Sequence, residues 1–224
     1  DVTPADEVPV VKANTSAGFS IISYTGQSGT YKVGHGLGIA PELIITKNRG
    51  SVNSWWTHIT VVDGTLDWGG LNLNQGFQAA DSYGISLPTS LTFGDDDDFT
   101  ANNTTAICYC FNSVAGYSKV GTYRGNGNAD GTFVALDFRP AFLLFKHTNA
   151  TKDWFIYDSK SQTYNVMGKY LKPNRDTLEQ TFATVDFLSN GFKIRTDDSA
   201  FNSDGSIYLF LAIAEAPFKN ARAR

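Results

Sequence analysis

The chain has 224 residues, enough to bury a good core as one domain or as two small ones. Its formal net charge is −4 and no basic stripe is present, which argues against duplex nucleic acid as a partner. No apolar run approaches the roughly 18 residues of a membrane-spanning helix. Aromatic residues make up 13% of the chain and 21 residues are glycine, a mixture typical of short strands joined by tight turns.

Residues 1–17 open with an acidic, proline-containing stretch, and we expect an extended linker there. The start shows neither an initiator methionine nor the pattern of a signal peptide. We therefore expect the chain to be a piece of a longer protein or a processed product.

Five residues that are hard to interchange recur 99 positions later (123 − 24 for the first pair). The pairs are Tyr24 and Tyr123, Gly26 and Gly125, Pro41 and Pro140, Lys47 and Lys146, and Trp55 and Trp154. Towards the end of each copy, Asp97, Asp98, Asn102 and Ile107 match Asp197, Asp198, Asn202 and Ile207 at an offset of 100 (197 − 97). This self-similarity predicts two copies of one unit, which we place at 18–115 and 116–218, before a short tail at 219–224.

Each copy opens with an aromatic strand that ends in a glycine-rich turn, at residues 24–29 and 123–128. Such a turn predicts a hairpin. Pro41 and Pro140 stand before apolar runs that lack alternation, so we expect strands covered on both faces. Trp55 and Trp154 begin the next strands, and their recurrence favours a role in the core.

The middle of the two copies diverges, and residues 169–180 are the best candidate for a short helix, limited by Pro173. Asn190 and Gly191 predict a type I′ turn between two strands. The last apolar runs, at 105–111 and 206–214, are long enough to be central strands. Cys108 and Cys110 lie two apart on the first of these, so we expect buried free thiols rather than a disulfide.

Each copy thus supplies five or six short strands with turn signals between them. This pattern predicts an all-β fold, an antiparallel β-sandwich of jelly-roll type built from two tandem homologous repeats. The sequence leaves open whether the copies form two sandwiches or interleave in one.

Two acidic loops precede the final strands, and their side chains offer the oxygen ligands that Ca²⁺ prefers. The candidate metal ligands are Asp97, Asp98, Asn102, Asp197, Asp198 and Asn202. Their spacing lacks the terminal glutamate of a calcium loop, and Asp and Asn also serve turns by bonding their own backbone. We favour turn use, keep calcium as the alternative, and expect no other cofactor.

Catalytic patterns are missing from the sequence. The three histidines stand outside metal-ligand spacings, and the segment Gly26-Gln-Ser28-Gly29 lacks the spacing of a nucleophile elbow. Glutamate is rare, so no pair among Glu42, Glu179 and Glu215 stands out for glycoside hydrolysis. We predict that the protein is not an enzyme.

Two tryptophans, Trp56 and Trp68, belong to the first copy only and flank loops, so we expect them to be exposed. Amphipathic rings of this kind stack on sugar faces, and recognition residues concentrate on loops of a rigid scaffold. Together with His58 and Tyr83 they form the predicted ligand-binding set.

Several strings of the second copy resemble the C-terminal domain of tail-fibre-like virion proteins, especially those of marine bacteriophages. They lie at 116–134, 138–146, 187–195 and 207–219. In the first copy the resemblance continues through Gly34-His-Gly-Leu-Gly-x-x-Pro41, and the basic finish at 220–224 looks like that family's C-terminus. The resemblance covers about residues 18–224, and the family's biochemical function is unknown.

This resemblance implies a virion protein, structural or receptor-binding, that assembles as a homotrimer and presents β domains at a fibre tip. It carries no catalytic residues over to this chain. We therefore predict a virion module that binds a host-surface glycan or protein and contacts other virion proteins, without nucleic acid and without membrane insertion. A purely structural capsid or head-fibre decoration protein is the alternative, and a glycan-degrading enzyme is the third hypothesis.

Overall fold

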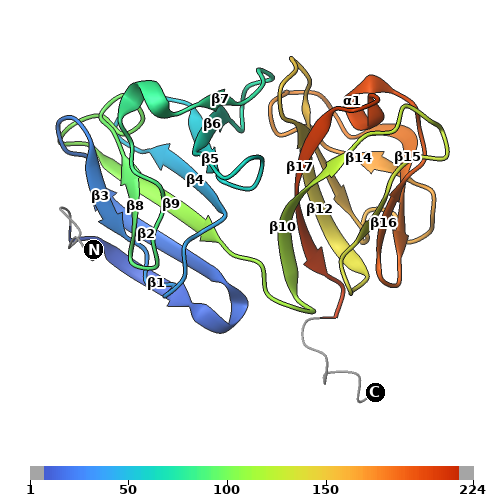
Figure 1. Ribbon diagram of the computed structural model, residues 1–224, viewed down its shortest axis with the longest axis horizontal. Helices are drawn as coiled ribbons and strands as arrows, with labels where there is room; N and C mark the ends of the chain where they lie inside the picture. The colour runs from blue at the N-terminus through green and yellow to red at the C-terminus, as the bar shows by residue number, and fades with distance from the viewer. Residues whose placement is uncertain (1–7, 217–224) are drawn as a thin grey trace. The chain divides into compact units, whose positions relative to one another are not determined.

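The computed structural model describes residues 8–216, whose regular secondary structure consists almost wholly of antiparallel strands (Figure 1). The chain forms two compact units. Within the described residues, the first unit comprises 8–73 and Phe77–Asn112, and the second comprises Asn74–Gly76 and 113–216. The predicted all-β, antiparallel sandwich is confirmed, whereas the start of the expected linker and the whole tail at 219–224 lie outside the described residues.

The first unit combines a seven-stranded sheet with a two-stranded one. The larger sheet has the order β1 (Val10–Asn14), β2 (Phe19–Thr25), β9 (Thr105–Phe111), β4 (Leu43–Asn48), β5 (Trp55–Ile59), β6 (Asp67–Gly70) and β7 (Gln78–Ala79). The smaller sheet pairs β3 (Tyr31–Gly34) with β8 (Thr92–Asp95), and two 3-10 turns, η1 (Thr15–Ala17) and η2 (Asp81–Tyr83), complete the unit. Strand β1 lies in the expected linker and forms the sheet edge beside β2.

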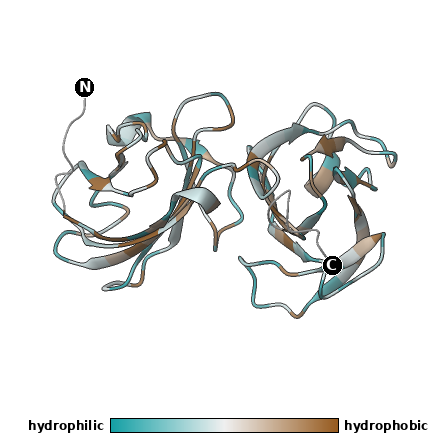
Figure 2. Ribbon diagram, turned by 90° about the horizontal axis from the view of Figure 1, so that it is seen from below, coloured by the Kyte–Doolittle hydropathy of each residue, from teal (hydrophilic) through white to brown (hydrophobic). Residues whose placement is uncertain are grey.

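The second unit contains two four-stranded sheets. One has the order β10 (Ser118–Arg124), β17 (Ile207–Ala214), β12 (Pro140–His147) and β13 (Trp154–Asp158). The other has the order β11 (Phe133–Ala135), β16 (Gly191–Ile194), β15 (Gln180–Leu188) and β14 (Met167–Tyr170), with α1 (Ser199–Asn202) before β17. Apolar stretches follow the strands in both units (Figure 2), and the core of the second is dominated by buried aromatic rings such as Phe145, Tyr157, Phe187 and Phe210.

The two units share a strand order, β2-β9-β4-β5 in the first and β10-β17-β12-β13 in the second. The register shows which residues correspond. Tyr24 pairs with Ala106 and Tyr123 pairs with Tyr208, so the last strands are related by 102 positions (208 − 106). The expected offset of 100 at the end of each copy is therefore wrong, and Ile107 corresponds to Leu209 rather than Ile207. Descent of the units from a duplication stays a prediction.

The glycine-rich turns after β2 and β10 are not hairpins, contrary to our expectation. Strand β3 pairs with β8 and β11 pairs with β16, so each turn carries the chain from one sheet to another. A Cβ atom at Gly26 would lie 2.5 Å from the carbonyl oxygen of Thr100, and one at Gly125 would lie 2.2 Å from that of Ser203. Glycine recurs here because the chain passes too close to the loop before the last strand for any side chain.

The helix predicted at residues 169–180 is also wrong. Part of this segment belongs to β14 and β15, and between them a turn is closed by the Arg175 N–H donating to the Lys172 carbonyl at 3.0 Å. Pro173 occupies the second position of this turn, where its fixed φ is favourable. The hairpin before Gly191 is confirmed, because Leu188 pairs with Gly191, but neither intervening residue has a positive φ and the turn is not type I′.

The predictions for the central strands are confirmed. Strands β9 and β17 each lie between two neighbours, and the run from Leu43 to Thr46 is wholly buried. Cys108 and Cys110 are free and fully buried, with Sγ atoms 3.8 Å apart.

Candidate functional site

Four aromatic side chains of the first unit meet around the ring of Phe99, and together they form what we call the first cluster. The centroids of Trp56, Trp68, Tyr83 and His58 lie 5.4, 5.4, 4.9 and 4.8 Å from that of Phe99. The interplanar angles of 57° to 86° correspond to tilted and edge-to-face packing, the arrangement that aromatic rings prefer. The structure thus brings together all four residues of the predicted ligand-binding set, around a phenylalanine that sequence analysis missed.

The members of the first cluster differ in exposure. Trp56, Trp68 and Tyr83 are half-buried, whereas His58 is only 3% exposed. The expectation of an accessible His58 is therefore wrong, because the second half of β5 is buried and the imidazole packs on Phe99. Burial lowers the pKa of His58 to about 4, so this ring is neutral at pH 7.

Three ring nitrogens of the first cluster are buried without a hydrogen-bond partner in the described part of the chain. They are Nε1 of Trp56, Nε1 of Trp68 and Nε2 of His58. Edge-to-face packing offers such groups a ring face in place of an oxygen acceptor. The nitrogen atoms of both indoles are thus buried, and the exposed part of each indole is apolar.

The second unit carries an aromatic cluster at the corresponding place, and we call it the second cluster. By the strand registers, Phe155 corresponds to Trp56 (155 − 56 = 99) and Phe201 to Phe99 (201 − 99 = 102). The centroids of Phe155 and Phe201 are 4.4 Å apart, those of Phe155 and Tyr170 are 5.4 Å apart, and Phe182 lies 6.3 Å from Phe201. Sequence analysis missed this cluster, although the 102-residue offset would have revealed it.

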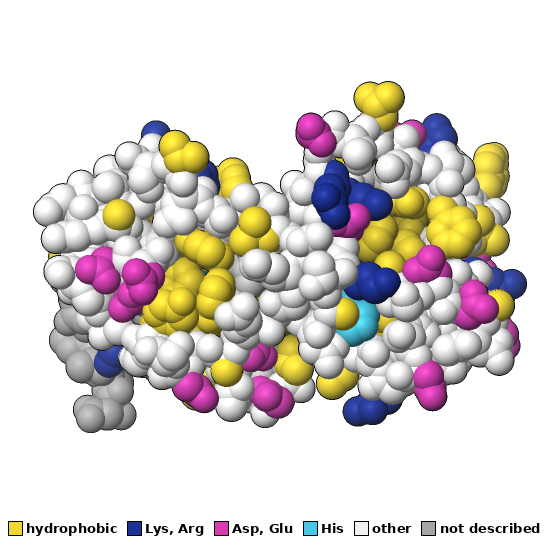
Figure 3. Space-filling model, turned by 90° about the horizontal axis from the view of Figure 1, so that it is seen from above, with side chains coloured by type: hydrophobic (Ala, Val, Ile, Leu, Met, Phe, Trp, Pro, Cys, Tyr) yellow, Lys and Arg dark blue, Asp and Glu magenta, His cyan; other side chains and the backbone are white. Residues whose placement is uncertain are grey.

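A pocket of 320 Å³ lies against the second cluster and has a basic rim. The Lys172 ammonium group is 5.6 Å from the centroid of Phe155 and 5.9 Å from that of Tyr170, within the range of cation–π attraction. Lys172 and Arg175 both form ion pairs with Asp153, at 3.0 and 2.8 Å. Basic side chains also border a hydrophobic patch on the surface of the second unit (Figure 3).

The rim is built on a turn that both units possess. In the second unit, Asn174 Oδ1 accepts the Trp154 N–H at 2.9 Å, and in the first unit Asn72 Oδ1 accepts the Trp55 N–H at 2.8 Å. The core role predicted for the two tryptophans is confirmed for Trp154, which is 1% exposed, while Trp55 is half-buried.

The same turn carries different residues in the two units. The Leu73 N–H donates to the Gly70 carbonyl at 3.1 Å, as Arg175 does to Lys172. Lys172 and Arg175 therefore stand where the first unit has Gly70 and Leu73, and the fold of the turn does not depend on the two cations.

The acidic loops serve turns. Asp198 Oδ1 accepts the Ala200 N–H at 2.7 Å, and Asp96 Oδ1 accepts the Asp98 N–H at 3.0 Å. Of the other candidate metal ligands, Asp97 is half-buried and Asp98, Asn102 and Asp197 are exposed. Within residues 8–216, no group of three or more His, Cys, Asp or Glu side chains is arranged to hold a metal ion.

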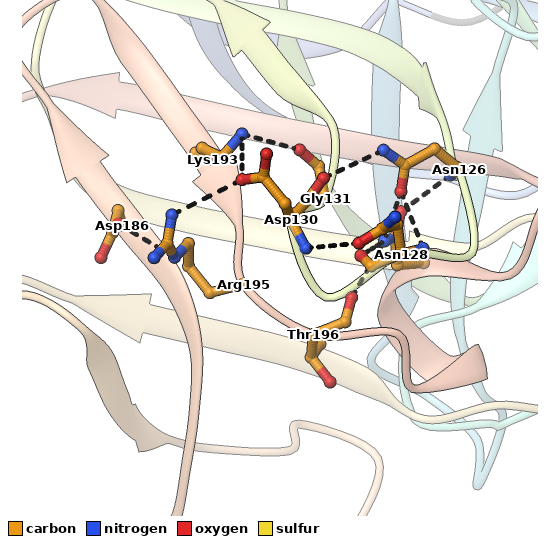
Figure 4. Close-up of polar contacts among 9 residues, drawn as sticks. Asn126, Asn128, Asp130, Gly131, Asp186, Lys193, Arg195 and Thr196 are labelled. Carbon is orange, nitrogen blue, oxygen red and sulfur yellow. Dashed lines mark hydrogen bonds and ion pairs between the residues drawn. The ribbon is translucent and has the colours of Figure 1, made fainter.

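The sixth candidate metal ligand, Asn202, is fully buried. It ties together two loops, whose residues Asn126, Asn128 and Thr196 are labelled in Figure 4. Its Nδ2 donates to Asn126 Oδ1 at 2.8 Å, to the Asn128 carbonyl at 2.7 Å and to the Thr196 carbonyl at 2.9 Å. Its Oδ1 accepts the Asn126 N–H at 3.0 Å. These bonds give Asn202 a structural role. Its amide oxygen and nitrogen are both engaged in them, which argues against this side chain as a calcium ligand.

A buried carboxyl group anchors the loop that carries Phe99. Asp95 is 1% exposed, and its Oδ2 accepts the hydroxyl groups of Tyr24 at 2.6 Å and Tyr31 at 2.9 Å. The Tyr24 hydroxyl also lies 3.2 Å from Thr100 Oγ1. Burial raises the pKa of Asp95 to about 6, against the effect of these hydrogen bonds.

Fold and site together define an all-β protein of two sheet-built units, each with an aromatic cluster near the loop before its last strand. A family described as a domain of unknown function, DUF7483, matches residues 5–217, and the chain belongs to this family. Neither a curated protein nor a solved structure matches the chain. In the described part of the chain, no helix has the length and apolar character needed to cross a bilayer.

Proposed function

We propose that this chain is a non-enzymatic attachment module of a bacteriophage virion, carried by a tail-fibre-like protein, that binds a glycan on the host surface. The motif resemblance supports the virion setting. The observation that supports glycan binding is the convergence of the predicted aromatic residues on Phe99.

The first cluster has the properties of a sugar platform. Trp56, Trp68 and Tyr83 are half-buried, and the indole nitrogens of the two tryptophans are buried, so the exposed part of each indole is apolar ring surface. A pyranose ring presents C–H groups on one face, and large aromatic rings supply a matching apolar surface at little entropic cost. The rings are held by their mutual contacts, which preorganises the platform for binding.

Adjacent tryptophans on β5 provide a matched test of this proposal. Trp55 and Trp56 point to opposite faces of the sheet, and only Trp56 belongs to the first cluster. On a glycan array or on host cells, we expect Trp56→Ala to abolish binding and Trp55→Ala to retain it, with circular dichroism showing that both variants fold. Loss of binding in both variants, or no glycan binding by the wild-type protein, would refute the proposal.

The resemblance also implies assembly as a homotrimer with other virion proteins as neighbours. Light scattering on the full-length protein tests this, and a stable monomer would count against a fibre. Binding to capsid subunits alone would favour a decoration protein instead.

A further inference from the structure

We infer that the pocket of the second unit binds a sugar ring that carries a carboxylate, such as a hexuronic acid. This inference rests on the proposed glycan-binding function and specifies the class of sugar for one of its two aromatic clusters.

The charge of the pocket favours an anion. Three basic side chains and two carboxylates line it, a formal charge of +1 (3 − 2) in a chain whose net charge is −4. Partial burial would raise the pKa of Asp153, but hydrogen bonds from Asn174, Lys172 and Arg175 lower it overall, so this carboxylate stays ionised. A positive pocket in an acidic protein attracts anionic ligands selectively.

Arg175 provides the group that would recognise the carboxylate. Its Nε donates to Asp153 Oδ1 at 2.8 Å, and its terminal nitrogens have no partner among the described residues. The side chain is 47% exposed and lines the pocket. A guanidinium group held at Nε presents its terminal N–H groups in a fixed fork, which matches the two oxygens of a carboxylate.

The apolar part of the pocket favours a ring over a small inorganic anion. Phe155 and Phe201 are almost fully buried, whereas Phe182 is 45% exposed and offers a ring surface at the pocket. The volume of 320 Å³ lies at the lower end of the range for ligand sites, about 300 to 1,000 Å³, and suits one or two sugar rings.

The two units form the same turn, one with the basic rim and one without it. The first unit makes the same turn with Gly70 and Leu73, and its strand β5 is preceded by Ser54 where the second unit has Asp153. Lys172, Arg175 and Asp153 are therefore additions to a turn that forms without them, and ligand recognition accounts for the addition.

The test uses the whole chain and two monosaccharides of the same size, glucuronate and glucose. Each is titrated into the ¹⁵N-labelled protein and followed by NMR chemical shifts at low ionic strength. We expect glucuronate to shift resonances around Phe182, and glucose to act at least about ten-fold more weakly, because a charged hydrogen-bonded pair is lost. Arg175→Leu introduces leucine, the residue that the first unit has at this position of the turn. It should weaken glucuronate binding by the same factor.

Arg124→Leu is the matched control, since Arg124 is an exposed arginine of the second unit that bonds the Gly205 carbonyl and lies outside the pocket lining. It should bind glucuronate like the wild type. Equal binding of the two sugars, unchanged glucuronate binding in Arg175→Leu, or no shift with glucuronate at millimolar concentration would each overturn the inference. The proposed function is judged separately by the tryptophan variants. It fails if Trp56→Ala binds glycan like the wild type, if Trp55→Ala loses binding as well, or if the wild type binds no glycan.

Discussion

The buried carboxyl group of Asp95 makes the stability of the first unit depend on pH in a direction opposite to that of most acids. Asp95 accepts hydrogen bonds from Tyr24 and Tyr31, yet burial raises its pKa to about 6. In Asp95→Asn the amide oxygen can still accept both hydroxyl groups, while the ionisable proton is lost. The substitution therefore removes the ionisable group at position 95 and keeps the size and shape of the side chain.

The size of the effect follows from the pKa difference. The folded pKa of Asp95 is about 6 and the unfolded value is 3.8, so the folded state binds the proton more tightly. The stabilisation from this proton is fully present below pH 3.8 and is lost as the pH rises through 6. A difference of about two pKa units corresponds to about 3 kcal/mol in the free energy of unfolding.

Urea unfolding followed by tryptophan fluorescence measures this effect, because Trp55, Trp56 and Trp68 all belong to the first unit. We expect the stability of Asp95→Asn relative to the wild type to rise by about 2.5 kcal/mol between pH 4 and pH 7.5, because the carboxyl group of the unfolded state is already partly ionised at pH 4. Asp63→Asn is the control, since Asp63 is exposed and Thr65 lowers its pKa. A difference between Asp95→Asn and wild type that is the same at both pH values would refute the reasoning.

Three further predictions follow from buried groups. Asn202→Ala should destabilise the second unit by about 3 kcal/mol in urea unfolding, because it leaves buried partners unpaired, whereas Asn102→Ala, an exposed residue, should change stability by less than about 0.5 kcal/mol. Cys108 and Cys110 should resist a thiol reagent in the folded protein and both react in urea, and rapid labelling without urea would contradict their burial. His58 stays neutral in the folded state down to about pH 4, whereas in the unfolded state it binds a proton already near pH 6.5. The free energy of unfolding therefore falls as the pH drops from 6.5 to 4. His58→Phe should reduce this fall, and an unchanged acid-unfolding profile would be the contrary result.

Features set by local sequence could be predicted. The apolar runs at β4, β9, β12 and β17 identify buried strands because too few polar residues interrupt them, whatever their neighbours are. Trp56 and Trp68 were nominated because no tryptophan stands at the matching positions of the second copy, and His58 and Tyr83 were added to them. All four side chains lie around Phe99.

Features set by distant partners could not be predicted. A glycine-rich turn indicates a change of direction, but the choice between a hairpin and a crossing to the other sheet depends on packing against residues such as Thr100 and Ser203, far along the chain. The offset of 100 came from matches among acidic and amide residues of polar loops, which recur by chance. Strand pairing, which showed the offset to be 102, involves residues that the sequence places about 90 positions apart.

The second cluster and its pocket could not be predicted for the same reason, and the charged residues of the pocket form one connected group. Asp153, Lys172 and Arg175 depend on one another. An isolated carboxylate at Asp153, whose side chain is 14% exposed, would be costly, and Lys172 without Asp153 would be an unpaired cation at 18% exposure. A change of charge at this turn therefore needs Asp153 and Lys172 together, because either one alone leaves a partly buried charge without its partner. The first unit holds Ser54, Gly70 and Leu73 at these positions and is neutral at all three, so under the proposed glycan-binding function the first unit would favour neutral sugars and the second acidic ones.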